Sequence, residues 1–229
     1  MSIELIPAIM PKNFEDLKDK LALVAGHVGV VQIDVMDGLF TNSKSWPYLY
    51  DVDFDFEKIV SQEEGFPFWE EINFEVDLMI NNPEKVIEKW ADAGAVRIII
   101  HNHSFKTADD FLAMARTIHD RSVECVLALH TDDSLDIISQ VIDELDAVQF
   151  MGINQIGFQG QEFNSDVLDR ISACKKLYPS LPVSIDGGVS LDTAQQLISV
   201  GVDRLVSGSA IFENSDIEEN LESFQAIVG

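Results

Sequence analysis

Three aspartates, Asp34, Asp77 and Asp186, each lie near the end of a short run rich in β-branched and apolar residues. Carboxylates can remove and return protons or bind a cation, and burying one is costly unless it is paired or coordinates a metal. For a single aspartate, a helix cap or a loop-anchoring hydrogen bond is the simpler interpretation. Three aspartates that converge on one face favour acid–base or metal chemistry.

The alternation of side chains along a strand indicates which residues accompany these aspartates. Around Asp34, the residues Val31, Ile33 and Val35 share one face, and polar residues share the other. The runs around Asp77 and Asp186 alternate in the same way. The residues that share a face with one of the three aspartates are Gln32, Met36, Glu75, Met79 and Ser184.

Glycines occur after three of the apolar runs in the C-terminal half. The candidates for binding a phosphate are Gly157, Gly160, Gly187, Gly188, Gly208 and Ser209. Glycine lets backbone N–H groups approach an anion, and a short helix that begins near Ser209 would add its dipole. Glycine pairs are also typical of tight turns, so the residue types alone are weak evidence. What favours a phosphate site is that these residues follow the last predicted strands.

Short β-rich runs alternate with longer amphipathic segments along the chain. Strands are predicted at about 3–9, 29–35, 73–79, 96–101, 123–129, 147–152, 182–186 and 203–207. Helices are predicted at about 13–25, 55–63, 83–93, 107–120, 134–144, 164–177, 190–200 and 216–227. Eight βα units in this length favour an α/β fold, a (β/α)8 TIM barrel that forms a single domain over residues 1–229. A doubly wound open sheet is the alternative.

A TIM barrel would bring the aspartates together, because its active site is built at the carboxyl ends of the strands. The loops after the seventh and eighth strands are the usual phosphate site of such barrels. The second connection, residues 39–72, is unusually long and contains Trp46, Tyr50 and Trp69. This length indicates a lid, an interface or a decorated loop, and exposed aromatics there would suit a homo-oligomer.

Charge and cysteine content exclude several classes of protein. The 229 residues include 15 Lys and Arg against 40 Asp and Glu, a net charge of −25, which argues against binding to nucleic acid or to an anionic membrane. Cys125 and Cys174 form neither a disulfide framework nor a metal-binding spacing, so we expect a cytoplasmic protein. No stretch approaches the ~18 apolar residues of a membrane span.

The motifs taken together resemble ribulose-phosphate 3-epimerases. They are the stretches 34–40, 76–79, 157–163, 185–189 and 206–212, in the family's order and spacing. The resemblance implies epimerisation at C3 of a ketopentose 5-phosphate, that is, interconversion of ribulose 5-phosphate and xylulose 5-phosphate through a metal-stabilised enediolate. It implies that Asp34 and Asp186 are the two acid–base groups. It also implies that Met36, Met79 and Met151 line the intermediate, although core filling would explain methionines equally well.

The metal set that the resemblance implies is altered in this chain. The family has two histidines and two aspartates, and here Gln32 and Asp77 occupy the histidine positions. Gln32, Asp34, Asp77 and Asp186 offer only oxygen ligands, which favour Mg²⁺ or Mn²⁺ over Zn²⁺. Ala8 also replaces a serine that supports substrate binding in the family.

These departures leave other functions open. One is a non-catalytic phosphosugar-binding protein on the same scaffold, and another is an epimerase for a different sugar phosphate. Lyase or decarboxylase chemistry ranks lower, because relatives with that chemistry pair an aspartate with a lysine on one strand, and no lysine follows Asp34 at that spacing.

Histidines near the predicted mouth are further candidates. His101 and His103 share the inward parity of the fourth strand. A polar wall of the pocket is the simpler interpretation, and replacement of the missing metal ligands is the alternative. His130, at the end of the fifth strand, is another pocket candidate, whereas His27 is expected at the surface.

Overall fold

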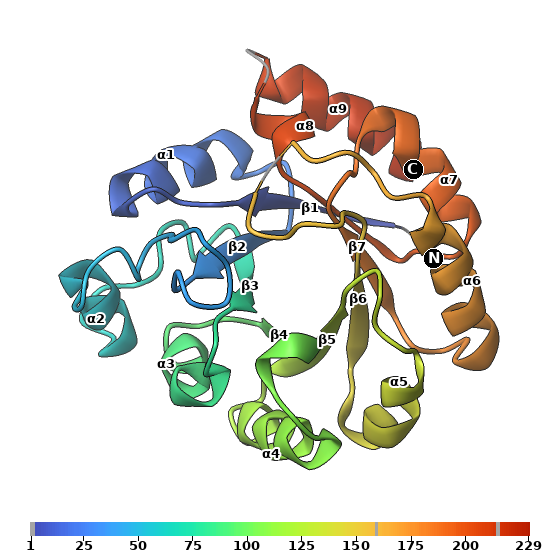
Figure 1. Cartoon of the computed structure of the whole chain (residues 1–229). Coiled ribbons are helices and arrows are strands. Elements are labelled where there is room, and N and C mark those ends of the chain that lie inside the picture. Colours follow the sequence, from blue (N-terminus) through green and yellow to red (C-terminus); the bar gives the residue numbers. More distant parts are fainter. Residues whose placement is uncertain (1–2, 159, 214–215) are drawn as a thin grey trace.

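The computed structural model describes residues 3–158, 160–213 and 216–229. Eight parallel strands pair in sequence order and close into a barrel, with β1 bonded to both β2 and β8. Figure 1 shows the strands at the centre and the helices around them. The strands are β1 (Glu4–Ile9), β2 (Val30–Met36), β3 (Asn73–Met79), β4 (Arg97–His101), β5 (Glu124–Leu129), β6 (Ala147–Met151), β7 (Val183–Asp186) and β8 (Arg204–Ser207). The predicted TIM barrel is confirmed, and the open sheet is excluded.

The helices lie where the amphipathic segments predict them. They are α1 (Phe14–Val24), α2 (Phe54–Val60), α3 (Ile87–Asp92), α4 (Ala108–His119), α5 (Asp136–Val141), α6 (Asp166–Leu177), α7 (Leu191–Ser199), α8 (Ser209–Phe212) and α9 (Ile217–Val228). Two predicted helices are interrupted. The segment 83–93 is a 3-10 turn, Pro83–Lys85, followed by α3, because Val86 between them has a non-helical φ of −125°. The segment 134–144 ends in a 3-10 turn, Ile142–Glu144.

The outward face of each strand packs beneath the helices. Val31, Ile33 and Val35 of β2 are fully buried there, as the alternation predicts. Helix α1 begins with a side-chain cap, because Asn13 Oδ1 accepts a hydrogen bond from the Asp16 N–H (2.8 Å). Gly94, after α3, has a φ of 98°, the left-handed conformation that ends many helices.

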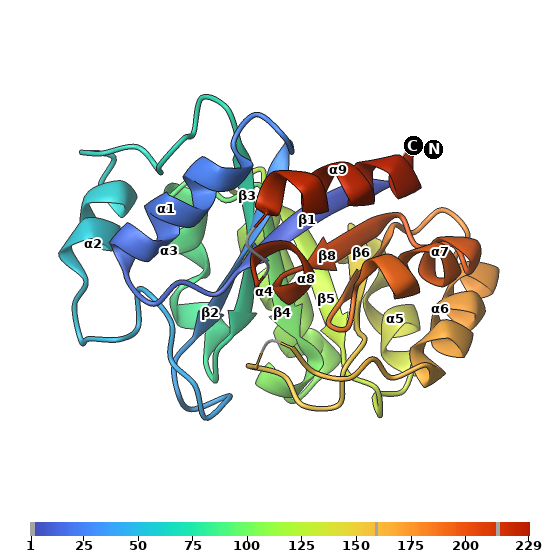
Figure 2. The same ribbon diagram turned by 90° about the horizontal axis from the view of Figure 1, so that it is seen from above.

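The long second connection is folded against the barrel. Trp46 is 1% exposed, and its ring lies 5.5 Å from Phe14 and 6.2 Å from Trp90. The prediction that Trp46 is one of the exposed aromatics was therefore wrong. Its ring fills the space between α1 and α3. Tyr50 and Trp69 are 73% and 64% exposed. In Figure 2 the loop after β2 and the loop after β6 extend on the same side of the barrel, which is the mouth.

Within the described ranges, no helix combines the length and the apolar composition needed to cross a membrane.

Candidate active site

The three aspartates converge at the mouth of the barrel. Asp34 and Asp77 are register partners on the adjacent strands β2 and β3, and Asp186 ends β7. One carboxylate oxygen of each lies within 4.8 Å of the others. Asp77 is fully buried, Asp34 is 6% exposed, and Asp186 is partly exposed to the cavity that it lines. The sequence alternation therefore led to a real cluster of three carboxylates.

A single glutamine amide joins two of these carboxylates. Gln32 Nε2 donates to Asp34 Oδ1 (2.8 Å) and to Asp186 Oδ2 (2.9 Å). Gln32 Oε1 and Asp77 Oδ2 are buried and have no hydrogen-bond partner among the residues that the structure describes. Because an unsatisfied buried oxygen is unfavourable, these two atoms indicate that the cluster is built to receive a further positive or donating group.

The electrostatics of the cluster favour protonation or a bound cation. Burial, and then the charges of Asp186 and Asp77, raise the pKa of Asp34 well above its ordinary value. Burial and the charge of Asp77 raise the pKa of Asp186 to about 7. Three neighbouring carboxylates that repel one another in a low dielectric have this effect, and a cation among them would reverse it.

The donor set fits a hard divalent cation. Asp34, Asp77 and Asp186 offer carboxylate oxygens, and Gln32 offers the unpaired amide oxygen Oε1. Oxygen ligands with net negative charge are typical of Mg²⁺ and Mn²⁺ sites. All four predicted ligands lie at this cluster. The structure therefore contains a candidate acidic metal site.

Two histidines extend the cluster towards β5. His101 Nε2 lies 2.7 Å from Asp77 Oδ1, and His101 Nδ1 lies 2.9 Å from His130 Nε2. His101 is fully buried, and the ring of Phe40 lies 5.3 Å from its ring. Burial and the neighbouring histidines lower the pKa of His130 to about 3, so its ring is neutral.

The prediction that His103 points inward on β4 was wrong. The strand ends at His101, and residues Asn102–Ser104 form a 3-10 turn that breaks the strand alternation. The side chain of His103 is 45% exposed and bonds Asp133 Oδ1 at 2.9 Å. His27 is exposed, as expected.

A cavity opens above the carboxylates, and its walls come from both predicted and unpredicted residues. Asp34, Asp186, Met79 and Met151 line it, whereas Met36 is fully buried and does not. The predicted phosphate-binding residues that line it are Gly157, Gly160, Gly187, Gly188, Gly208 and Ser209. Sequence reasoning did not identify the apolar part of the wall, which includes Ile153, Ile156 and Val189, because apolar loop residues carry no periodic signal.

The glycines after β7 leave no room for a side chain. Gly187 and Gly188 have φ values of 94° and 68°, where residues with a side chain are strained. A Cβ on Gly188 would lie 2.8 Å from the Phe163 backbone, and one on Gly187 would lie 2.7 Å from Ile153. The loop after β6 is therefore packed directly on the loop after β7. Gln159 of the predicted loop motif lies outside the described residues.

The match to known proteins covers almost the whole chain. The model of the ribulose-phosphate 3-epimerase family matches residues 4–212. The chain belongs to this family. It is 30% identical to the ribulose-phosphate 3-epimerase of Bacillus subtilis over 224 residues, covering 93% of this chain and 94% of that protein. It is 26% identical to the enzyme of the same name from Schizosaccharomyces pombe over 218 residues, covering 94% and 90%.

Solved structures share the fold of this epimerase-family chain. KGPDC from Streptococcus mutans superposes with a TM-score of 0.73 at 16% identity, covering 100% of this chain and 98% of that one. The 3-hexulose-6-phosphate synthase from Salmonella typhimurium superposes with a TM-score of 0.72 at 15% identity, covering 100% and 98%. At this identity the likeness establishes the barrel and not the reaction.

Proposed function

We propose that this chain is a sugar-phosphate 3-epimerase that interconverts ribulose 5-phosphate and xylulose 5-phosphate. The observation that carries the proposal is the pair Asp34 and Asp186, held by one Gln32 amide at 2.8 and 2.9 Å on the floor of the cavity. Epimerisation needs two acid–base groups that reach opposite faces of one carbon. The strands that carry these carboxylates, β2 and β7, lie on different sides of the barrel (Figure 1), and both carboxylates line the cavity.

In this proposal the two aspartates exchange one proton each with the substrate. One carboxylate removes the proton at C3, next to the carbonyl, and the other returns a proton to the opposite face. Without a cation, burial and the charge of Asp77 raise the pKa of Asp186 to about 7, so its carboxyl group can hold a proton near neutral pH, as a general acid requires. A bound cation would lower this pKa and favour the carboxylate form, which a general base requires. Gln32 keeps both carboxylates oriented towards the cavity throughout, and Met79 and Met151 keep water from the reacting carbon.

Gln32 Oε1, Asp34, Asp77 and Asp186 would hold a divalent cation, with Mg²⁺ or Mn²⁺ favoured over Zn²⁺. When bound, the cation supplies positive charge to the substrate oxygens as negative charge develops. The unpaired buried oxygens of Gln32 and Asp77 support this assignment.

The glycine loops after β7 and β8 are the proposed site of the phosphate group. Gly187, Gly188, Gly208 and Ser209 line the cavity, and their N–H groups act at contact distance. Helix α8, which begins at Ser209, is a single turn of 4 residues, so backbone N–H groups rather than a long helix dipole would hold the anion. Such a site needs no basic side chains, which agrees with the net charge of −25.

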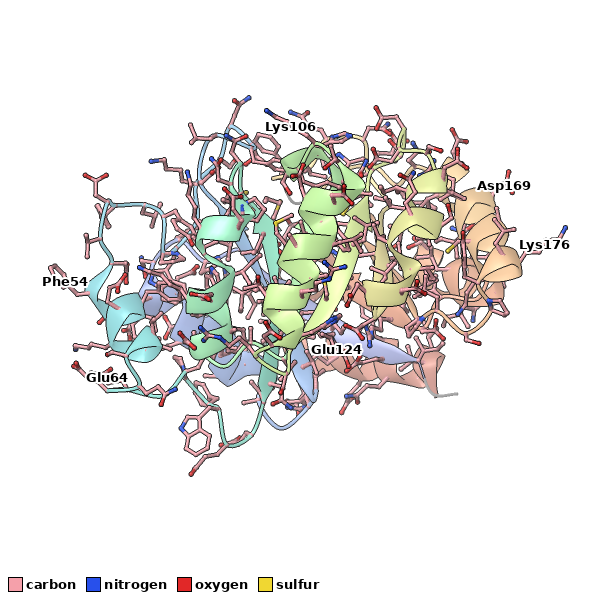
Figure 3. All side chains as sticks on the ribbon, turned by 90° about the horizontal axis from the view of Figure 1, so that it is seen from below. Phe54, Glu64, Lys106, Glu124, Asp169 and Lys176 are labelled. Carbon is pink, nitrogen blue, oxygen red and sulfur yellow. The ribbon has the colours of Figure 1, made fainter. Side chains whose placement is uncertain are left out.

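The test is a coupled assay of xylulose 5-phosphate formation from ribulose 5-phosphate with Mg²⁺, Mn²⁺ or Zn²⁺. Wild type should turn over with Mg²⁺ or Mn²⁺ and should exchange the C3 hydrogen with D₂O. Asp186→Asn should lose at least about 10²-fold in rate, the usual contribution of an acid–base group. Asp169→Asn, which changes an exposed carboxylate that points away from α6 (Figure 3), should retain full activity.

Two outcomes would overturn the proposal. Stabilisation of the fold by ribulose 5-phosphate without turnover in any divalent ion would indicate a non-catalytic phosphosugar-binding protein. Turnover of another sugar phosphate, with none of ribulose 5-phosphate, would indicate a different epimerase substrate.

A further inference from the structure

We propose that His101 is a positioning residue that orients the carboxylate of Asp77 for cation binding. The inference rests on the proposed metal site and assigns a role to a residue outside it. The ligand concerned is a hard divalent cation, and the contribution of His101 is the single N–H that it directs at Asp77.

The contact is short and fully enclosed. His101 Nε2 lies 2.7 Å from Asp77 Oδ1, and both side chains are 0% exposed. The two residues come from the neighbouring strands β3 and β4, where Asp77 pairs with Ile99 and Leu78 with Ile100, so His101 stands on the inward face two residues after the partner of Asp77. The contact therefore holds one Asp77 oxygen and leaves Oδ2 without a partner among the described residues.

The carboxylate of Asp77 determines which nitrogen of His101 carries the proton, and His130 completes the arrangement. His130 Nε2 lies 2.9 Å from His101 Nδ1. A neutral imidazole has one donor and one acceptor, and only a donor at Nε2 can bond a carboxylate at 2.7 Å. We therefore assign the proton of His101 to Nε2, with Nδ1 accepting from His130 Nε2–H. The hydrogen bonds then run in one direction, from His130 through His101 to Asp77.

Phe40 packs against both histidines of this chain of hydrogen bonds. Its ring centroid lies 5.3 Å from that of His101 and 6.3 Å from that of His130. Because His101 is fully buried beneath it, water has no ready access to take over the donor role. Without His101, the Asp77 carboxylate would be free to rotate away from Asp34 and Asp186.

The expected loss of metal affinity follows from measurements on other residues that hydrogen-bond to metal ligands. Removing such a partner lowers metal affinity by about 10- to 100-fold. His101→Gln can place its amide N–H where Nε2 is and bond Asp77, whereas His101→Leu has a similar size and no donor. The matched pair separates loss of the donor from loss of packing.

The experiment measures Mn²⁺ binding by calorimetry and by electron paramagnetic resonance, with melting in EDTA as a check on folding. We expect His101→Leu to bind Mn²⁺ about 10- to 100-fold more weakly than wild type, with a changed resonance spectrum, and His101→Gln to bind within about 3-fold of wild type. His27→Leu, at an exposed histidine, is the control and should bind as wild type does. If His101→Leu does not fold, His101→Asn replaces it, because its shorter amide reaches towards His130 and not towards Asp77.

The outcomes separate this proposal from the proposed function. Wild type that binds no divalent cation would refute the metal site itself. Wild type that binds Mn²⁺, together with a His101→Leu variant of equal affinity, would refute the role of His101 and leave the metal site standing. Equal losses in His101→Gln and His101→Leu would also refute it, since the imidazole and not its N–H would then be required.

Discussion

Replacing Asp186 by asparagine should stabilise the metal-free protein even though it removes a proposed acid–base group. Asparagine has nearly the same shape, and its Oδ1 can still accept the hydrogen bond that Gln32 Nε2 now donates at 2.9 Å. What disappears is a negative charge that burial and Asp77 disfavour, as the pKa of about 7 for Asp186 shows. The variant therefore removes repulsion and leaves packing intact.

The size of the effect follows from the pKa. An aspartate in the unfolded chain has a pKa of about 3.9, which is about 3 units below the pKa of Asp186 in the folded state. Each unit of difference between the two pKa values corresponds to about 1.4 kcal/mol of stability. Stability is therefore lost as the pH rises from about 4 to about 7. Because Asp186 faces the cavity and is partly solvated, we expect a gain of about 2–4 kcal/mol for Asp186→Asn at pH 8 and under about 1 kcal/mol at pH 4.

The assay is urea unfolding of wild type and variant in EDTA at pH 4, 5 and 8. Addition of Mg²⁺ at pH 8 should narrow the difference, because the cation stabilises the wild-type carboxylates and is bound poorly by the variant. A variant that is less stable than wild type at pH 8 in EDTA, or a gain that does not change with pH, would show that the three carboxylates do not repel one another as argued. Asp169→Asn provides the matched control at an exposed carboxylate.

Three further predictions concern the cation, the second connection and a surface histidine. Stabilisation by saturating Mg²⁺ or Mn²⁺, measured by thermal melting, should be larger at pH 8 than at pH 5, because protons compete for carboxylates of raised pKa; an equal effect at both would contradict this. Trp46→Ala should lower the free energy of unfolding by about 3–5 kcal/mol in urea titrations, since the ring is 1% exposed; a loss below about 1 kcal/mol would refute its role in anchoring the connection. His119 bonds Glu144 (3.2 Å) and Asp146 (2.8 Å), and its hydrogen bonds and charge interactions with these carboxylates raise its pKa against the opposing effect of burial. Its stabilising effect should be complete below about pH 6.5 and lost as the pH rises through the raised pKa, so His119→Gln should flatten the dependence of stability on pH in that window; an unchanged dependence would count against the ion pair.

Local sequence determined the scaffold. The alternation of apolar and polar residues along β2 places Val31, Ile33 and Val35 beneath the helices and directs Asp34 inward, because the side-chain period of a strand is two residues. Repetition of short strands and longer helices then selects a parallel barrel, since right-handed crossovers leave few other arrangements. The carboxylate cluster could be predicted for the same reason, once the strands were assumed to close.

Local sequence also misled where regular structure ends. The inward parity assumed for His103 failed because β4 stops at His101 and the chain turns into a 3-10 helix. Met36 has the parity of a site residue, yet it is fully buried and does not line the cavity. The alternation of side chains predicts which face of a strand a residue lies on. It does not predict how far along the barrel axis the side chain lies from the mouth.

Sequence by itself therefore determined the barrel, the inward carboxylates and the glycine loops, because each depends on a period or a neighbour within one element. Only the tertiary structure decided that one Gln32 amide holds Asp34 and Asp186 together, with Gln32 and Asp186 separated by 154 positions of the chain. It likewise decided that His130 and His101 stand in line behind Asp77. These side-chain hydrogen bonds between strands depend on the closure and register of the barrel, which bring the atoms within about 3 Å of one another. The spacing of residues along the sequence does not reveal such contacts.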